Sequence, residues 1–393
     1  MRSILPHAAL LLLCISPACS SGGSRNGLSG KEKLTANQYL FGFVGRPSFP
    51  AFPTTSADIQ SVDGRFFFKD DGTYEMRQSD GTLLSQSDYQ LDSDGTLAIA
   101  VPTSTTTLVY RGAYGLLGPT GDVFLTDRVG SGVGVYFGTT LVQGNADLAP
   151  LVGDWRMFSL HSILAPGGSV PDEDLVGVAL GGSLTLAADG SFTGTAVESE
   201  NGAVTVTGTA NDFQAFADGK FTVEMTIDPP TRPDYQRGFV AGGGARFLAG
   251  VDPDSGGADD AAGILLMLRK RTASYAIADL AGKYTLGMLT LFIKPSASGT
   301  DSSIGTLELT TAGNFRIDAT NNAGQAFSYT GTFTANADGG LTFAVSGTNE
   351  TWQGAFDDGY HTIVFVDAFK EVRPSLQKEL NLGMAVRPKP TTP

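Results

Sequence analysis

An acidic stretch in the middle of the chain has the clearest potential for metal chemistry. It runs from Val251 to Asp260, and it contains four carboxylates within nine positions: Asp252, Asp254, Asp259 and Asp260. Hard cations such as Ca²⁺ prefer oxygen ligands of this kind. The spacing departs from the EF-hand loop, because Gly256 takes the third acidic position and no closing Glu follows. The sequence therefore favours a solvated acidic loop, and a weak calcium site at these four carboxylates is the alternative.

Nucleophilic catalysis has little support in the sequence. Beyond the N-terminal segment the chain has two histidines, His161 and His361, and no Gly-x-Ser-x-Gly motif. A hydrolase would need one of them beside a carboxylate and a serine in a shared cleft. We therefore predict that the protein is not an enzyme and uses no cofactor. We expect His161 to be a loop residue after an opening strand.

Both cysteines, Cys14 and Cys19, lie near the N-terminus. Residues 1–18 have a positive start at Arg2, a short apolar run and small residues before Cys19, which predicts an export signal. The end of this segment resembles the lipobox of bacterial lipoproteins, with Ser16 where that motif usually has Leu. The resemblance implies that Cys19 carries lipid and becomes the first residue of the mature protein. Ordinary cleavage and secretion is the alternative.

Residues 19–33 are rich in Ser and Gly and predict a flexible tether to the membrane. Ser20 lacks the acidic side chain that marks inner-membrane retention in Gram-negative lipoproteins, so the resemblance implies the outer membrane or the cell surface. The net charge is −14, which argues against a nucleic-acid partner because such partners need clustered Lys and Arg. The expected partner is the membrane, through the N-terminal lipid.

Three degenerate repeats follow the tether and must position the acidic stretch and the two histidines. We assign them to three β-domains, residues 34–146, 147–275 and 276–393. The second opens with Leu151-Val152-Gly153-Asp154-Trp155, the third with Leu280-Ala281-Gly282-Lys283-Tyr284, and the first more loosely, ending at Tyr39. A later motif also recurs, as Tyr110-Arg111-Gly112, Gln236-Arg237-Gly238 and Trp352-Gln353-Gly354. Repeats of this length indicate small domains with their own cores rather than a solenoid.

Within each repeat, short runs alternate between polar and apolar residues and are separated by Asp-Gly turns such as Asp189-Gly190. This pattern predicts an antiparallel meander with one face in the core and the other in water. About eight strands per repeat can close into an up-and-down β-barrel. We therefore predict an all-β protein of three tandem barrels, with β-sandwiches or a propeller as alternatives.

The Gly-x-Trp opening strand, the eight up-and-down strands and the long first loop resemble the lipocalin-like barrels. In that family the Trp sits at the closed end and an Arg from a late strand packs over it. The resemblance implies this structural role for Trp155 with Arg269, and for Tyr284 with Arg387. It also implies that the first loop covers a ligand, which places Phe49 and Phe52 over the mouth of the first barrel.

Two functions from different classes remain open. The first is a non-catalytic, lipid-anchored protein of the cell envelope that holds a small apolar ligand inside a barrel. The second is a structural or adhesive surface spacer whose filled barrels bind nothing. An apolar cavity inside a barrel would favour the first, and a packed interior would favour the second.

Overall fold

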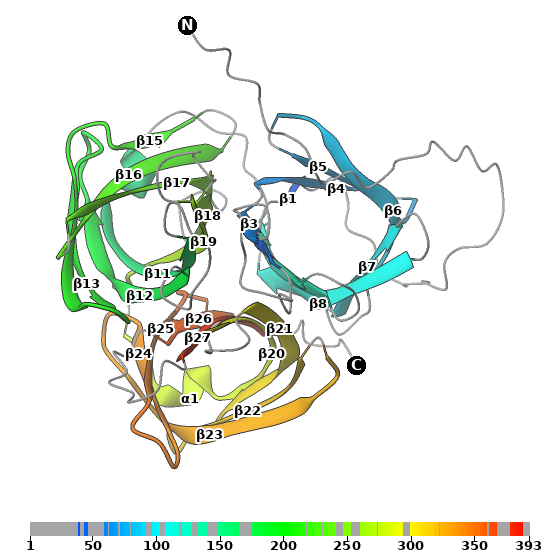
Figure 1. Cartoon of the computed structure of the whole chain (residues 1–393). Coiled ribbons are helices and arrows are strands. Elements are labelled where there is room, and N and C mark those ends of the chain that lie inside the picture. The colour runs from blue at the N-terminus through cyan, green and yellow to red at the C-terminus, as the bar shows by residue number, and fades with distance from the viewer. Residues whose placement is uncertain are drawn as a thin grey trace, which may run out of the picture.

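The structure is a computed structural model of the whole chain. It describes residues 38–39, 43–45, 59–61, 63–69, 71–78, 80–91, 96–102, 107–117, 120–127, 133–139, 148–164, 175–216, 219–229, 231–240, 247–252, 260–272, 274–293, 299–321, 323–359, 361–367 and 378–387. The strands of this part form three antiparallel sheets, each built from one continuous stretch of sequence, and the sheets lie side by side (Figure 1).

Barrel 1 contains β1 to β10, which form one antiparallel sheet of ten strands. β10 pairs with β2, β2 pairs with β3, and β1 pairs with β4, so the sheet curls from β1 through β4 to β10 and on to β2 and β3, and its end strands β1 and β3 are not paired with each other among the described residues. The strands are β1 (Gln38–Tyr39), β2 (Phe43–Gly45), β3 (Ile59–Ser61), β4 (Gly64–Phe68), β5 (Thr73–Gln78), β6 (Leu83–Leu91), β7 (Thr96–Pro102), β8 (Thr107–Leu117), β9 (Thr120–Asp127) and β10 (Val133–Thr139).

Barrel 2 contains β11 to β19 and is preceded by a 3₁₀ helix, η2 (Ala149–Leu151). Its strands are β11 (Gly153–Leu164), β12 (Leu175–Leu186), β13 (Phe192–Glu198), β14 (Gly202–Gly208), β15 (Phe213–Ala215), β16 (Lys220–Asp228), β17 (Arg232–Val240), β18 (Phe247–Asp252) and β19 (Asp260–Arg269). β14 pairs with β16, and β11 pairs with β19, which closes the ring.

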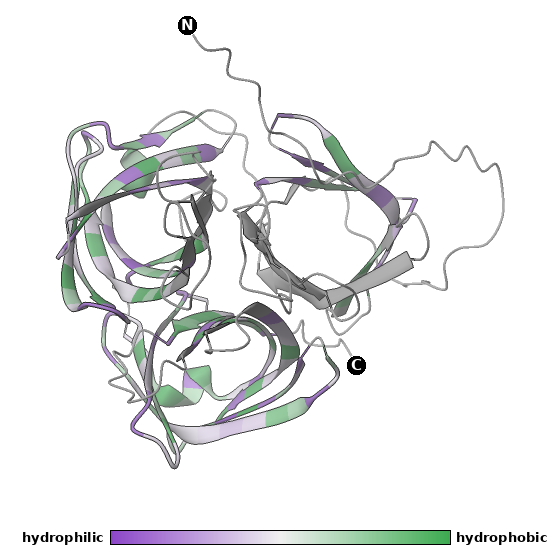
Figure 2. Ribbon diagram, in the orientation of Figure 1, coloured by the Kyte–Doolittle hydropathy of each residue, from purple (hydrophilic) through white to green (hydrophobic). Residues whose placement is uncertain are grey.

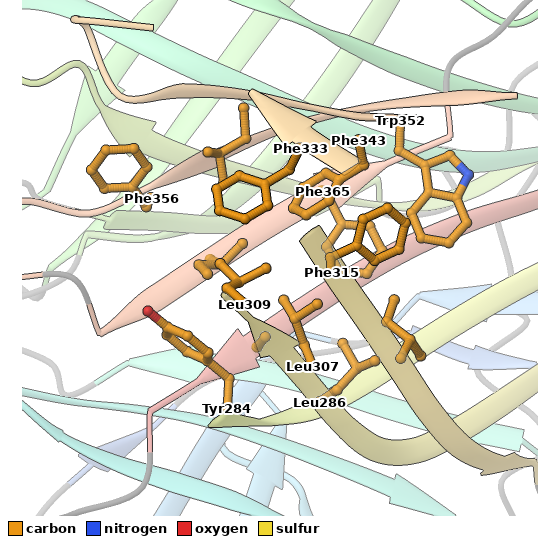
Figure 3. Packing of buried hydrophobic residues seen from close by; sticks show 14 of the residues in the cluster. Tyr284, Leu286, Leu307, Leu309, Phe315, Phe333, Phe343, Trp352, Phe356 and Phe365 are labelled. Atoms are coloured by element: carbon orange, nitrogen blue, oxygen red, sulfur yellow. The ribbon is translucent and has the colours of Figure 1, made fainter. Parts of the chain in front are cut away.

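Barrel 3 is a closed barrel of eight strands, preceded by a short helix, α1 (Ile277–Leu280). Its strands are β20 (Gly282–Ile293), β21 (Gly299–Leu309), β22 (Asn314–Asn321), β23 (Ala326–Ala335), β24 (Gly340–Val345), β25 (Thr351–Phe356), β26 (Thr362–Val366) and β27 (Lys378–Val386). Apolar side chains from all eight strands fill the described interior, with aromatic rings such as Phe315, Phe343 and Trp352 packed together (Figure 3).

The prediction of an all-β protein with antiparallel barrels is confirmed, and the alternatives of β-sandwiches or a propeller are not what the chain forms. The alternation that led to it is visible along the strands (Figure 2). The Asp-Gly turns also form as expected. Gly190 has a φ of +82°, which favours glycine, and the Asp189 carboxylate accepts a hydrogen bond from the Ser191 amide at 2.9 Å.

The alternation suggested that the outer faces of all the strands lie in water. In the structure some of these outer faces are buried. Barrels 2 and 3 bury their facing outer surfaces in a shared apolar cluster, here called the inter-barrel core. Its members from barrel 2 are Phe158, Leu160, Ala179, Ile264, Leu266 and Leu268; those from barrel 3 are Leu289, Leu291, Ala355, Val364, Val366, Leu380, Leu382, Met384 and Val386. β19, β20 and β27 are therefore covered on both faces.

Polar contacts flank the inter-barrel core. Arg156 of β11 makes an ion pair with Asp338 of barrel 3. Arg271, which lies between β19 and α1, is buried and donates hydrogen bonds to the carbonyl oxygens of Asp357 and Asp358 at 3.2 and 2.9 Å. Its guanidinium lies 5.1 Å from the centre of the Phe356 ring. The end of barrel 2 is thus bound to the end of barrel 3.

Barrel 1 also contacts its neighbours. β3 lies against β19, and β8 and β9 lie against β20. Asp63, which is buried, forms an ion pair with Arg237 of barrel 2 at 2.6 Å. Within the described residues, no helix has the length and apolar character needed to cross a membrane.

Candidate functional site

The end of barrel 2 next to η2 is closed by Trp155 and Arg269. Trp155 is fully buried and donates its indole N–H to the carbonyl oxygen of Leu151 at 2.9 Å. Arg269 lies directly across the strand pair from Trp155, with its guanidinium 5.3 Å from the ring centre. It also donates to the carbonyl oxygens of Pro150, at 2.9 Å, and of Val152. The arginine therefore stacks on the indole and binds the end of η2 at the same time.

Barrel 3 repeats this arrangement with different residue types. Tyr284 is buried and donates its hydroxyl to the carbonyl oxygen of Leu280 at 2.8 Å. Arg387 lies 4.8 Å from the ring centre and donates to the Tyr284 hydroxyl at 2.5 Å and to the Asp279 and Ala281 carbonyl oxygens. Burial raises the pKa of Tyr284, although the nearby Arg387 charge opposes the shift.

The structure thus brings together both pairs that the lipocalin-like resemblance implied. In each barrel the arginine donates to carbonyl oxygens at the end of a short helix, where backbone carbonyl groups lack a partner within the helix. A guanidinium over an aromatic face adds about 0.5–2 kcal/mol. The side chains at both closed ends bind one another and the backbone of their own barrel.

The half of barrel 2 away from η2 is here called the far half. It holds a group of buried polar side chains that face the interior. They are Ser159, His161, Glu198 and Gln236. The expectation that His161 is a loop residue is wrong, because it lies within β11 with only 6% of its surface exposed. Its ring lies against Gly263 of β19, where a Cβ atom would be 2.5 Å from Nδ1. A histidine fits there because its strand neighbour has no side chain.

The corresponding half of barrel 3 is polar too, but its groups bind one another. Thr290 donates to the Asn381 amide oxygen at 2.7 Å, and Asn321 donates to Asp301 at 2.8 Å. The Tyr329 hydroxyl donates to Glu379 at 3.2 Å. Burial, together with the neighbouring carboxylates, raises the pKa of Tyr329 strongly, so its hydroxyl stays protonated.

The predicted calcium ligands fall at the β18–β19 connection. Asp252 is the last residue of β18 and Asp260 the first of β19, whereas Asp254 and Asp259 lie outside the described residues. In the part of the chain that is described, no three acidic, histidine or cysteine side chains lie close enough to hold a metal ion. The calcium site stays a prediction.

Three further predicted site residues also lie outside the described part of the chain: Cys19, Phe49 and Phe52. Sequence reasoning missed the polar groups in the far half of barrel 2 and in the corresponding half of barrel 3. One signal existed, because Asp127, Asp252 and Asp367 recur at or directly after the end of the last strand but one of each barrel. An aspartate repeated there does not by itself indicate which side chains lie beside it.

Comparisons with known proteins add little beyond the fold. No protein-family model matches the sequence, and a comparison with curated proteins finds no match. Among solved structures, transferrin-binding protein B from Haemophilus parasuis aligns with 91% of this chain and 77% of its own at 9% identity and a TM-score of 0.29. The isotype 1 transferrin-binding protein B from Neisseria meningitidis aligns with 91% and 77% at 10% identity and a TM-score of 0.22.

A Nostoc punctiforme protein of unknown function from the DUF3598 family aligns with 63% of this chain and 99% of its own, at 14% identity and a TM-score of 0.22. Similarities this weak carry no inference about a ligand or partner. The fold defines the class: an all-β protein of three antiparallel sheets, of which the second and third close into barrels with separate apolar interiors.

Proposed function

We propose that the chain is a non-catalytic, lipid-anchored protein of the bacterial cell envelope that binds a small apolar ligand in barrel 1. The observation that carries the proposal is the aromatic wall of this barrel, formed by Phe66, Phe68, Tyr74 and Tyr89 on the buried face of β4 to β6. Phe66 and Phe68 stack at 5.6 Å, and Tyr89 meets Phe68 edge-on at 5.0 Å. An apolar molecule inside this barrel would pack against these rings.

The anchor rests on Cys19 and the export signal before it. In this arrangement residues 19–33 hold the barrels away from the membrane, at the outer membrane or the cell surface. Secretion after ordinary cleavage is the alternative, and the two differ in whether the protein stays with membranes.

The ligand is tested by native mass spectrometry of the full chain purified in mild detergent. We expect a co-purified apolar molecule that is lost when Phe49 and Phe52 are both changed to serine. Phe216→Ser is the matched control, because this phenylalanine is exposed on barrel 2. A wild-type mass with no added molecule, or one that the double variant retains, would argue against the proposal.

The anchor is tested separately with Cys19→Ser. We expect this variant to leave the membrane fraction while keeping any bound ligand. A wild-type protein recovered entirely outside the membranes would favour secretion.

The second function, a spacer that binds nothing, is supported by the apolar clusters that fill the closed ends of barrels 2 and 3. These clusters include Trp155, Phe213 and Phe221 in barrel 2 and Phe315 and Trp352 in barrel 3. A ligand-free mass in the first experiment, with normal membrane attachment, is the outcome expected of a spacer.

A further inference from the structure

Gln236 of barrel 2 has a buried carbonyl oxygen that accepts no hydrogen bond from any described residue. The residue is fully buried on β17 and lies opposite Val223, a member of the barrel 2 core. Its Nε2 donates to the Asp234 carboxylate at 2.8 Å. This bond fixes the orientation of the amide, since a flipped amide would bring two acceptor oxygens together. Buried amide oxygens in native proteins almost always have a donor.

In barrel 3 the equivalent level of the interior is filled by side chains of the barrel itself. Its backbone register places Trp352, Asp367, Asn381 and Thr290 on four neighbouring strands. Trp352 fills its share of the interior and packs on Tyr329 and Phe365, with ring centres 5.2 and 5.3 Å away. Its N–H donates to Glu350, while Thr290 donates to Asn381. The groups of this level are paired within the barrel.

In barrel 2 the equivalent positions are Gln236, Asp252, Gly263 and His161. Glutamine replaces the much larger tryptophan. The space left where glycine replaces asparagine is taken by the ring of His161, which is larger than Thr290, so the reduction in side-chain volume falls at Gln236. The orphaned oxygen of Gln236 therefore lies where barrel 3 has an indole ring.

The chemistry around this oxygen favours a donor with positive charge. Gln236 presents an acceptor, and Asp234 beside it is a carboxylate. Glu198, fully buried, and Ser159 face the same interior. A ligand that offers N–H donors and no acceptor matches such a set, and an ammonium group has this property.

We infer that the far half of barrel 2 binds a small primary ammonium compound, whose N–H donates to Gln236 Oε1 with the charge beside Asp234. This site is separate from the apolar site proposed for barrel 1 and does not depend on it. Donation from a charged group is the stronger kind of hydrogen bond, so removal of the acceptor should reduce affinity at least tenfold.

The test uses isothermal titration calorimetry of the full chain in mild detergent at pH 7, with n-butylamine as the probe and 1-butanol as its uncharged counterpart. We expect the amine to bind and the alcohol to bind at least tenfold more weakly. Gln236→Met keeps the shape and removes the acceptor, and it should lose amine binding. Gln214→Met, at an exposed position on β15, should leave binding unchanged.

Failure of the amine to bind the wild-type chain would overturn the inference, as would equal binding of the alcohol or undiminished affinity in Gln236→Met. Gln236→Glu provides a second readout if the methionine variant does not fold. It retains an acceptor and adds negative charge, so it should bind the amine at least as tightly as the wild type. Weaker binding by this variant would also contradict an ammonium ligand.

Discussion

Two arginines, Arg269 and Arg387, make equivalent contacts in barrels 2 and 3, although the aromatic partner is Trp155 in one and Tyr284 in the other. Each comes from the last strand of its barrel and binds carbonyl oxygens of the short helix that precedes the first strand. Each also lies over an aromatic ring. The arrangement joins the short helix before the first strand to the end of the last strand, in addition to the pairing of those two strands.

Removal of the Arg269 guanidinium should therefore cost stability. In Arg269→Met the aliphatic packing remains, but the Pro150 and Val152 carbonyl oxygens lose their donor and Trp155 loses its cation. We expect the free energy of unfolding to fall by about 1–3 kcal/mol, measured by urea denaturation. Arg316→Met is the control: this arginine is 60% exposed and pairs with Asp318 at the surface, so its loss should leave the free energy of unfolding close to that of the wild type. Equal losses would contradict the role of Arg269.

Tyr284 makes a second residue-scale prediction, which concerns alkaline pH. Burial raises its pKa above the value of about 10 expected in the unfolded chain. The folded state therefore holds this proton more tightly, and stability falls as pH rises from about 10 toward the folded pKa. Tyr284→Phe has no such proton, so its stability should decline less over the same range. Parallel unfolding curves of the two proteins between pH 9 and 11 would count against this.

At the scale of strands, the sequence predicted the barrels for a sound reason. Alternation and Asp-Gly turns are local properties, and both Leu265 and Trp155 face the interior that they predict. Leu266 shows where local pattern stops being informative. It lies on the outer face of β19 together with the apolar residues Ile264 and Leu268. These residues indicate that the face is covered, but they do not indicate which element covers it.

The candidate sites show the same limit. The pairing of Trp155 with Arg269 could be predicted because the lipocalin-like resemblance places these residue types in the first and a late strand of the domain. The role of Gln236 could not be predicted, because it depends on the cross-strand register that places it level with Gly263 and His161. A register shift of one residue would turn the same glutamine toward water.

Leu265 and Leu266 offer a matched test of the inter-barrel core. They are adjacent on β19, both buried, and face the barrel 2 interior and barrel 3 respectively. Either leucine-to-alanine change should cost about 2–5 kcal/mol. Hydrogen exchange should distinguish them, since Leu266→Ala should also speed exchange in β26 and β27, whereas Leu265→Ala should act within barrel 2. The same exchange pattern in both variants would mean that the barrels unfold independently of their contact.

Asp338 makes an acid-pH prediction for the contact between the same two barrels. Partial burial opposes ionisation of this carboxyl, but the hydrogen bond and the charge of Arg156 outweigh it and hold the pKa below the usual value. Stability from this pair is therefore complete above about pH 4 and is lost as pH falls through the lower, folded pKa.

Asp338→Asn should lower stability at pH 7 by less than about 1 kcal/mol, because the Asp338 side chain is 37% exposed and solvent screens the pair. Its further loss on acidification should be smaller than that of the wild type. Calorimetric melting at pH 7 and pH 3 measures both quantities, and a wild-type difference no larger than that of the variant would contradict the assignment.

For the whole molecule, the three barrels differ in how they are attached. Barrels 2 and 3 share the inter-barrel core and the buried Arg271, which make them one body. Barrel 1 contacts that body through β3, β8, β9 and β10, with the Asp63–Arg237 ion pair among the contacts (Figure 1). The two partners of this pair differ in burial, because Asp63 is buried and the Arg237 side chain is 40% exposed.

That asymmetry predicts which partner matters more to the attachment of barrel 1. Asp63→Asn leaves an arginine that water can solvate, whereas Arg237→Met leaves a buried carboxylate without this cation, which is the costlier situation. We expect Arg237→Met to accelerate hydrogen exchange in β4 and β5 more than Asp63→Asn does, with barrel 3 unchanged in both. The double variant should resemble Asp63→Asn, because the carboxylate is then absent. A larger effect from Asp63→Asn would show that the buried carboxylate is stabilised by groups other than Arg237.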